Sequence, residues 1–412
     1  MTAGKGTIAD FALFGGPALF DRPRSIGNLV TPDFERFMSY SRMFLEARQY
    51  TNNGPANRLL ENRLAEFHQT QRCVTFSTAF WGLSLAMRCL ALPGRREIVM
   101  PSLTYRRMGE IAASAGLVPR YCEVDRTTRA QTAETVAACI NDDTALLLGA
   151  HPTVNCCDAA GLEKLSAETG VPLLFDSVES VYETCGGRKV GSFGRAEGFS
   201  IHASKLVNGF EGGYVTTDDH QLADRLVYMR GFGFAEMDTV VEFGFNAKLN
   251  EVHAAMALTG LDDLEEQVIR NRVRYEQYRR EIEEVPGISI VEFDESEKCS
   301  YKNVLAEIGP GWPLSRDDTL TLLTAEGALA RAYYSPALHT HQPGFEIRHG
   351  ELPVSEELAT RFLLLPCGDQ MASEDITAVV GLLTVIAARG GELRDRLEGV
   401  SLSTGACGEA AS

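Results

Sequence analysis

The sequence has no long apolar segment and no excess of positive charge. No window reaches the roughly 18 uninterrupted apolar residues that a membrane-spanning helix needs. Residues 1–17 lack a basic stretch followed by an apolar one, so we expect no secretory signal there. The formal net charge is −17, whereas nucleic acids and anionic membranes attract basic surfaces. These absences argue against a nucleic-acid or membrane partner and favour a cytoplasmic protein.

The cysteines show no pattern of a disulfide framework or a metal site. There are ten, and Cys156 and Cys157 form the only close pair. The sequence has no C-x-x-C motif and no Cys/His cluster with the spacing of metal ligands. We therefore expect reduced thiols, several of them in the core, and no bound metal.

Helix-like and strand-like segments alternate from about residue 58 to residue 230. The chain has 412 residues, enough for two or three units of about 150 residues each, and 44% of the residues are hydrophobic. Short apolar or β-branched runs separated by helix-length stretches predict an α/β fold, with a mostly parallel sheet covered by helices on both faces. The expected strands are 73–76, 97–100, 117–124, 145–148, 172–175, 198–201 and 213–216.

Pro119 and the residue pattern after Gly244 add detail to this predicted fold. Pro119 cannot donate a hydrogen bond, so its run is expected to be an edge strand or a shorter one. After Gly244 a long charged helical run at 246–285 precedes another strand at 288–291, which predicts a smaller α+β domain. We expect an N-terminal arm at 1–57, a large domain at 58–245, a small C-terminal domain with an interdomain helix at 246–397, and a disordered tail at 398–412.

Two residues stand where buried strands end. Asp176 closes an apolar run, at the kind of position where open α/β sheets place ligand-binding groups. Lys205 follows the next predicted strand, in a turn that contains Ser204 and His202. Taken alone, neither residue predicts a catalytic site, since the aspartate could simply cap a following helix. Together, in this order and followed by a glycine-rich segment, they predict a common site.

The pair suits pyridoxal 5'-phosphate (PLP). A lysine amine forms a Schiff base with an aldehyde, and a buried carboxylate keeps a pyridine nitrogen protonated. Ser200 offers a hydroxyl to a phosphate, and the helix expected after Thr78 and Ala79 offers free backbone N–H groups. Tyr105 follows another buried strand, where an aromatic ring can lie against a cofactor. The structural alternatives are a strand-end hydroxyl, an ordinary N-cap and a packed tyrosine.

These residues resemble those of a known family, the PLP-dependent sugar aminotransferases of the DegT/DnrJ/StrS family. The resemblance extends from residues 13–17 to residues 364–366 and is most specific at 199–217, 244–251 and 100–105. Within the family the chain looks most similar to the NDP-4-keto-6-deoxysugar 4-aminotransferases. The resemblance implies a fold-type I PLP-dependent transferase, in which residues 58–245 form the PLP-binding domain.

The resemblance also implies roles for individual residues. Lys205 corresponds to the Schiff-base lysine, Asp176 to the pyridinium partner and Tyr105 to the ring-stacking aromatic. Asn246 matches an asparagine that family members extend across a dimer interface to the partner's cofactor phosphate, which implies a homodimer with shared active sites. Ser200 and the backbone near Thr78 and Ala79 would hold the phosphate.

The chain departs from the family pattern at three places. Ala79-Phe80 stands where the family has Gly-Thr or Ala-Thr, and residues 151–155 replace a usual His-x-x-Gly pattern. Glu179 stands where the family has Gln or His near the cofactor's ring oxygen. A second negative charge close to Asp176 requires that Glu179 be protonated or find a cation.

Three functions remain open at this point. The leading one is aminotransfer from an amino acid, glutamate by resemblance, to a keto group of a nucleotide-linked deoxysugar, in secondary-metabolite or glycan biosynthesis. The second keeps PLP but changes the chemistry to dehydration or elimination, or the substrate to a non-sugar; Phe80 and Glu179 motivate it, whereas the retained Lys205 favours transfer. The third is a non-catalytic sensor, against which the presence of both Lys205 and Asp176 argues. His339 lies in a segment that resembles the mouth of the family's active site, but it could equally be a surface histidine.

Overall fold

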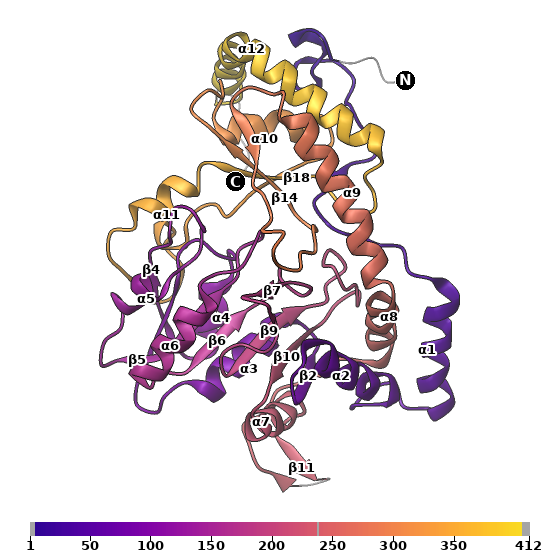
Figure 1. Cartoon of the computed structure of the whole chain (residues 1–412), viewed down its shortest axis with the longest axis vertical. Coiled ribbons are helices and arrows are strands. Elements are labelled where there is room, and N and C mark those ends of the chain that lie inside the picture. Colours follow the sequence, from indigo (N-terminus) through magenta and orange to yellow (C-terminus); the bar gives the residue numbers. More distant parts are fainter. Residues whose placement is uncertain (1–4, 237–238, 406–412) are drawn as a thin grey trace.

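The computed structural model describes residues 5–236 and 239–405, with side chains described up to Glu398. It has a lower part built on a large sheet and an upper part built on a smaller one, and helices α8 and α9 run from one to the other (Figure 1).

The large sheet has eight strands in the order β17-β4-β3-β5-β6-β9-β10-β2. All neighbouring pairs are parallel except those of β10, which runs antiparallel to both β9 and β2. The expected α/β fold with a mainly parallel sheet is therefore confirmed. The strands are β2 (Arg72–Phe76), β3 (Glu97–Pro101), β4 (Val118–Cys122), β5 (Thr144–Ala150), β6 (Leu173–Asp176), β9 (Ala196–Ser200), β10 (Gly213–Thr217) and β17 (Arg348–His349).

Alternate residues of the central strands enter two different cores. In β5, Leu146 and Leu148 join one cluster while Leu147 joins the other. In β6, Leu174 points to the first cluster and Leu173 to the second. Since successive side chains of a strand face opposite sides of a sheet, a sheet with helices on both faces needs apolar residues at every position.

Helices cover both faces of this sheet. One core contains residues of α3, α4 and α7, and the other contains residues of α2, α6 and α8. The helices of the lower part are α1 (Phe34–Ala47), α2 (Pro55–His68), α3 (Ala79–Leu90), α4 (Met108–Ser114), α5 (Ala133–Ala137), α6 (Ala159–Thr169), α7 (His220–Arg230) and α8 (Glu251–Asp262).

The upper part is an antiparallel sheet of four strands in the order β13-β14-β18-β16, with helices around it. The helical run expected at 246–285 consists of two helices, α8 and α9, which meet at Asp263. The elements are α9 (Leu264–Ile282), β13 (Ile288–Ile290), β14 (Val304–Ile308), α10 (Arg316–Ala325), β16 (Arg331–Ala332), α11 (Pro353–Leu358), β18 (Phe362–Leu365) and α12 (Ser373–Gly405).

The last helix differs from the expected tail. Helix α12 continues to Gly405, so residues 398–405 are helical, and residues 406–412 lie outside the described part of the chain. Its segment Ser373–Glu398 is long and apolar enough to cross a membrane by length and composition alone. Ile376, Val379 and Leu383 of this segment are buried in the core of the upper part, as in a core helix of a water-soluble fold.

The strand that contains Pro119 is second from the edge. Strand β17 pairs with β4 through Arg348–Arg120 and His349–Tyr121, just beyond the proline. Of the two alternatives for the Pro119 run, the shorter strand is found, since β4 covers Val118–Cys122 instead of 117–124, and the edge position is held by a strand of only two residues. The pairing of β4 with β17 begins after Pro119, because proline has no N–H to donate.

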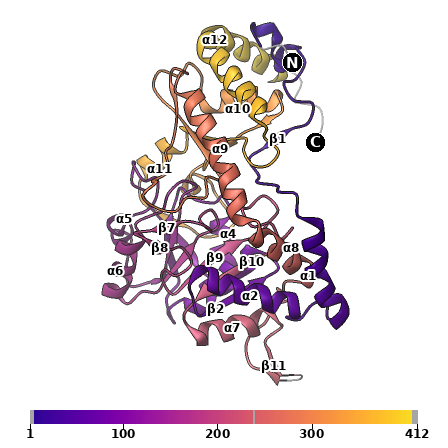
Figure 2. The same ribbon diagram turned by 45° about the vertical axis from the view of Figure 1, so that its right-hand side comes forward.

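The N-terminal segment contacts both parts of the molecule. Strand β1 (Arg24–Ser25) pairs with β15 (Ala328–Leu329) in the upper part, and α1 then lies beside α8 in the lower part. Figure 2 shows this course of the chain, from the top beside α12 down to α1. The short elements are η1 (Ile8–Asp10), η2 (Ala12–Phe14), η3 (Leu338–Thr340), β7 (Thr184–Cys185), β8 (Arg188–Lys189), β11 (Phe234–Glu236) and β12 (Thr239–Val240).

A buried glutamate joins α2 to α8. Helix α2 begins after Gly54, which has no side chain to cap it. Glu251, fully buried at the start of α8, accepts hydrogen bonds from the backbone N–H of Ala56 at 2.7 Å and of Asn57 at 3.3 Å. A carboxylate at a helix N-terminus accepts hydrogen bonds from the free amides and interacts favourably with the positive end of the helix dipole.

We therefore predict that Glu251→Ala lowers the free energy of unfolding by about 1–3 kcal/mol, because the amides of α2 are left buried without an acceptor. Urea unfolding of the purified protein measures this. Glu266→Ala is the control, since Glu266 is exposed on α9 and its substitution should change stability by less than about 0.5 kcal/mol. Equal effects of the two substitutions would contradict the capping role.

Candidate active site

A cavity of about 600 Å³ opens at the carboxyl ends of β5, β6 and β9, where the lower part faces the upper part. Open α/β sheets bind ligands at this edge. The cavity is lined by every predicted site residue except Asn246, namely Thr78, Ala79, Tyr105, Asp176, Glu179, Ser200 and Lys205. Within the described residues, no group of three or more His, Cys, Asp or Glu side chains is placed to hold a metal ion.

Asp176 is a buried acid at the end of β6. Its side chain is close to Lys205 and accepts a hydrogen bond from the Val178 N–H at 3.3 Å. Burial raises the pKa of Asp176 to about 7, although the Val178 amide and the Lys205 charge oppose this shift. Without a cation directly against it, this carboxyl is only partly ionised near neutral pH.

Lys205 lies in a loop that is fixed by the backbone. The Lys205 N–H donates to the His202 carbonyl at 2.8 Å, and the Ala203 N–H donates to the Phe210 carbonyl at 2.9 Å. The loop returns through Gly213, where a Cβ would come within 2.4 Å of the backbone nitrogen of Ala79. Only glycine permits this close approach, which brings the lysine loop against the start of α3.

The start of α3 and the end of β9 form one side of the cavity. Thr78 is the N-cap of α3, and its hydroxyl accepts a hydrogen bond from the Trp81 N–H at 3.4 Å. The first amides of a helix have no partner within the helix, so those of Ala79 and Phe80 are suited to an anion. Ser200 is buried at the end of β9 and adds a hydroxyl.

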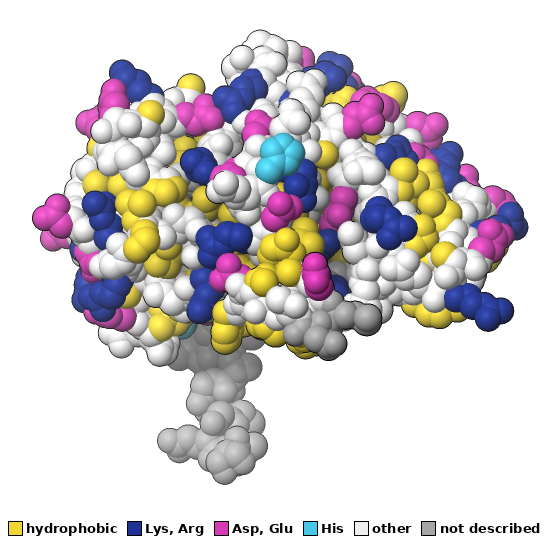
Figure 3. Space-filling model, turned by 90° about the horizontal axis from the view of Figure 1, so that it is seen from below, with side chains coloured by type: hydrophobic (Ala, Val, Ile, Leu, Met, Phe, Trp, Pro, Cys, Tyr) yellow, Lys and Arg dark blue, Asp and Glu magenta, His cyan; other side chains and the backbone are white. Residues whose placement is uncertain are grey.

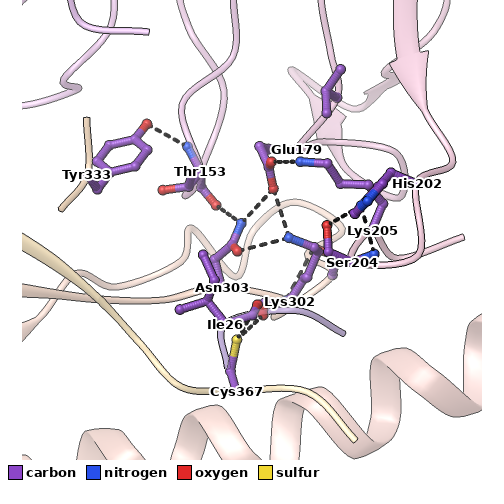
Figure 4. A network of polar contacts seen from close by, with 12 residues as sticks. Ile26, Thr153, Glu179, His202, Ser204, Lys205, Lys302, Asn303, Tyr333 and Cys367 are labelled. Atoms are coloured by element: carbon purple, nitrogen blue, oxygen red, sulfur yellow. Dashed lines mark hydrogen bonds and ion pairs between the residues drawn. The ribbon is translucent and has the colours of Figure 1, made fainter. Parts of the chain in front are cut away.

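Glu179 bridges two lysines (Figure 4). One carboxylate oxygen accepts a hydrogen bond from Lys205, and the other accepts one from Lys302 at 2.9 Å and one from Asn303 at 3.2 Å. Burial alone would raise the pKa of Glu179, but the two ammonium groups outweigh it and hold the pKa well below its ordinary value. Of the two possibilities that the sequence left open, Glu179 therefore takes the second: it is ionised and paired with cations.

His151 presents an unpaired donor to the same cavity. Its ring stacks on Phe175, with centroids 5.3 Å apart, and burial lowers its pKa to about 4. Nδ1 accepts a hydrogen bond from the Cys157 N–H at 3.2 Å, so Nε2 carries the proton of the neutral ring. Among the residues that the structure describes, this buried Nε2 has no hydrogen-bond partner, so it is a candidate donor to a ligand.

Tyr105 and Asn246 take up different positions. Tyr105 lines the cavity and is 48% exposed, so its stacking on a cofactor ring stays a prediction. Asn246 lies outside the cavity, where its side chain accepts a hydrogen bond from Lys248 at 2.8 Å. Within one copy of the chain, the structure does not bring Asn246 to the other site residues.

His339 is not a surface residue. It is 7% exposed, and its two ring nitrogens contact the Ser102 hydroxyl at 2.7 Å and the Glu356 carboxylate at 3.0 Å. Ser102 follows β3, three residues before Tyr105. His339 therefore connects α11 to the segment that carries Tyr105.

Comparisons with known proteins agree on one family. The model of the DegT/DnrJ/EryC1/StrS aminotransferase family matches residues 33–384. A dTDP-4-amino-4,6-dideoxy-D-glucose transaminase from Shigella dysenteriae is 24% identical over 370 residues, which are 89% of this chain and 100% of the relative. The erythromycin biosynthesis sensory transduction protein EryC1 from Saccharopolyspora erythraea is 26% identical over 335 residues, which are 80% of this chain and 90% of the relative.

Solved structures have the same fold. DesI, determined in the presence of its TDP-sugar product, is 35% identical and superimposes with a TM-score of 0.88, covering 95% of this chain and 100% of DesI. TlmJ, an aminotransferase from Streptoalloteichus hindustanus, is 25% identical with a TM-score of 0.81, covering 89% of this chain and 99% of TlmJ.

The fold and these similarities define a PLP-dependent aminotransferase of fold type I. The chain belongs to the DegT/DnrJ/EryC1/StrS aminotransferase family, as the sequence motifs predicted. It is thus an enzyme rather than a non-catalytic sensor.

The cavity fits PLP. A lysine amine and a buried acid are available for the aldehyde and the ring nitrogen, and helix amides with Ser200 are available for the phosphate. The unpaired Nε2 of His151 adds a donor for an acceptor atom of the cofactor.

Sequence reasoning missed the residues that the upper part contributes. Lys302 and Asn303 reach Glu179 from the segment just before β14, and Tyr334 lines the cavity. The only signal in the sequence was the requirement of Glu179 for a cation, which does not say where the cation lies.

The raised pKa of Asp176 predicts that the free energy of unfolding of the cofactor-free protein depends on pH. The native state holds a proton on Asp176 up to about pH 7, whereas the unfolded chain releases it near the ordinary value of 3.8. The stability that this group contributes is complete below about pH 4 and is lost as the pH rises to about 7. We expect Asp176→Asn to stabilise the apoprotein by a few kcal/mol, roughly, at pH 8, and much less at pH 4.

Urea unfolding of both apoproteins across this pH range measures the difference. Asp142→Asn is the control, because Asp142 lies exposed in the turn before β5 and does not line the cavity. A difference between Asp176→Asn and wild type that stays constant from pH 4 to pH 8 would show that Asp176 is not a buried acid of this kind.

Proposed function

We propose that this aminotransferase moves an amino group from an amino acid, L-glutamate, to a keto group of a nucleotide-linked deoxysugar in secondary-metabolite or glycan biosynthesis. The observation that carries the proposal is the cavity that brings Lys205, Asp176 and Ser200 together with room for a substrate. Its support from comparison is the similarity to DesI, whose structure was determined in the presence of its TDP-sugar product, and to a transaminase named for a dTDP-linked aminosugar.

PLP, when bound, supplies an aldehyde for the amino group and a ring that accepts electrons. The Lys205 amine would form the covalent tether and, when free, would move a proton between the substrate carbon and the cofactor carbon in each half of the reaction. Asp176 would hold the proton of the ring nitrogen, and that cation would in turn favour the ionised carboxylate. Ser200 and the amides at Ala79 would hold the phosphate, and Tyr105 would cover the ring.

A second pocket supports a nucleotide-linked substrate. It has a volume of about 230 Å³ and shares Arg107 and Glu110 with the main cavity, so the two spaces adjoin. Arg106 also lines it, and Tyr121 and Phe345 form apolar walls. A nucleotide offers a flat base to apolar walls and a diphosphate to arginines.

The alternative of dehydration or elimination has less support than transfer. Glu179, which motivated it, is paired with Lys302 and so is accommodated without a change of reaction. Phe80 lines the cavity where a threonine hydroxyl is usual, but the amides of α3 remain in place. The retained Lys205 is the group that transfer needs.

We further propose that the enzyme is a homodimer with shared active sites. The segment around Asn246 carries exposed apolar side chains: Phe232 is 50% exposed, Val240 63% and Phe243 62%. Figure 3 shows hydrophobic side chains gathered in patches among charged ones on the face seen from below. Exposed apolar patches are typical of contact surfaces, and a partner there would explain why Asn246 lies outside the cavity of its own chain.

We place the enzyme in the cytoplasm. All nine cysteines within the described residues are free, which suits a reducing compartment.

The donor half of the reaction gives a direct test. We expect the purified protein to show the absorbance of lysine-bound PLP and to lose it when L-glutamate is added, because the amino group passes to the cofactor. Lys205→Ala should lack both the bound-cofactor band and turnover, whereas Lys164→Ala, on an exposed position of α6, should retain them. A spectrum that no amino acid changes would favour the elimination chemistry instead.

Shared active sites predict complementation between two inactive variants. Mixed dimers of Lys205→Ala and Asn246→Ala contain one site in which Lys205 and the partner's Asn246 are both intact. After unfolding and joint refolding, we expect the mixture to regain about a quarter of the wild-type activity, since half of the dimers are mixed and each has one good site. Activity no higher than that of either variant alone would refute the sharing of sites.

A further inference from the structure

Lys302 is a second lysine in the active site, which none of the motifs of the chain indicates. It is 6% exposed and lies just before β14 in the upper part of the molecule. Its ammonium contacts Glu179 at 2.9 Å and the Asn303 side-chain oxygen at 3.1 Å. Its backbone carbonyl accepts a hydrogen bond from the Cys367 thiol at 3.0 Å. Figure 4 shows that Lys302 and Lys205 approach Glu179 from different segments, Lys205 from the loop after β9 and Lys302 from the segment before β14.

Both lysines therefore share one anion. A buried ammonium is costly unless it is paired, and burial alone would lower the pKa of Lys302. Glu179 outweighs that effect and raises the pKa, so Lys302 stays charged. Asn303 supports the pair from the side, because its amide donates both to Glu179 and to the Thr153 carbonyl.

The other ionisable groups around this trio are acids or weak acids. They come from β6, the segment after it, the upper sheet and the segment after β18. The groups that face Glu179 or Lys302 are Asp176, Glu183, Tyr333, Tyr334 and Cys367.

We infer that Lys302 is a positioning residue: it holds Glu179 in place as an anion and limits how firmly Glu179 retains the proton on Lys205. The importance of that proton rests on the proposed function, in which Lys205 must act as a neutral amine. The charge arrangement itself does not depend on it.

The physical reason is a competition between two interactions. Glu179 alone would stabilise the ammonium form of Lys205, which can neither attack an aldehyde nor accept a proton. The positive charge of Lys302 opposes that effect, because Lys302 and Lys205 bind the two oxygens of one buried carboxylate and charges interact strongly in a buried site. Lys302 also leaves Glu179 with a counter-ion whenever the Lys205 nitrogen is engaged with a ligand.

The test measures the reactivity of the Lys205 amine in the cofactor-free enzyme. Acetic anhydride modifies neutral amines, so brief labelling at a series of pH values, with the Lys205 peptide quantified by mass spectrometry, gives a midpoint for that amine. We expect Lys302→Met to move the midpoint upward by about one pH unit or more, and Glu179→Gln to move it downward. The double variant Glu179→Gln/Lys302→Met removes one charge of each sign and should return towards wild type.

Two controls separate charge from structure. Lys298→Met removes an exposed lysine from the same segment and should leave the midpoint unchanged. Lys302→Arg keeps the charge and should stay closer to wild type than Lys302→Met. If Lys302→Met does not fold, Glu179→Gln is compared with the double variant, because these two proteins differ only at Lys302. The double variant must then have the higher midpoint.

A midpoint that Lys302→Met leaves unchanged or moves downward would overturn the inference. The labelling uses neither cofactor nor substrate, so it distinguishes this inference from the proposed function. If the midpoint shifts as expected but the enzyme transfers no amino group, the proposed function is rejected, whereas the inference about Lys302 stands. In an active enzyme, we expect Lys302→Met to lower kcat more than it raises KM, and to displace the pH profile upward.

Discussion

The active site depends on the fact that neighbouring parallel strands end at the same edge of the sheet. Strands β5, β6 and β9 are adjacent and parallel, and they deliver His151, Asp176 and Ser200 to one place. Strand β10 runs the other way, and its first residue, Gly213, pairs with Ser200. The loop between β9 and β10 therefore turns at that edge, which keeps Lys205 over the ends of the strands.

Two carboxyl groups in this site have opposite tendencies. Burial dominates at Asp176 and raises its pKa, whereas paired ammonium groups dominate at Glu179 and lower it. Environments that shift the pKa values of two acids in opposite directions suit the acids to different roles. Asp176 is suited to respond to the charge of a ligand, and Glu179 is suited to remain an anion throughout.

The sequence predicted what depends on local pattern. The central strands, the acid at the end of β6, the lysine after β9 and the helix start at Thr78 all follow from short runs of residues and lie where they were expected. Lys302 could not be predicted, because it is 123 residues from Glu179 and precedes a strand of ordinary composition. The pairing of β17 with β4 and the burial of His339 depend in the same way on contacts between distant segments.

Strand β17 also affects how the chain must fold during synthesis. Arg348 and His349 come late in the chain, yet they form the outer strand of the sheet that residues 72–217 build. Until the ribosome has made them, β4 presents open N–H and C=O groups, to which another nascent chain can add. Pro119, which interrupts that row of donors, makes the waiting edge a poorer template for aggregation.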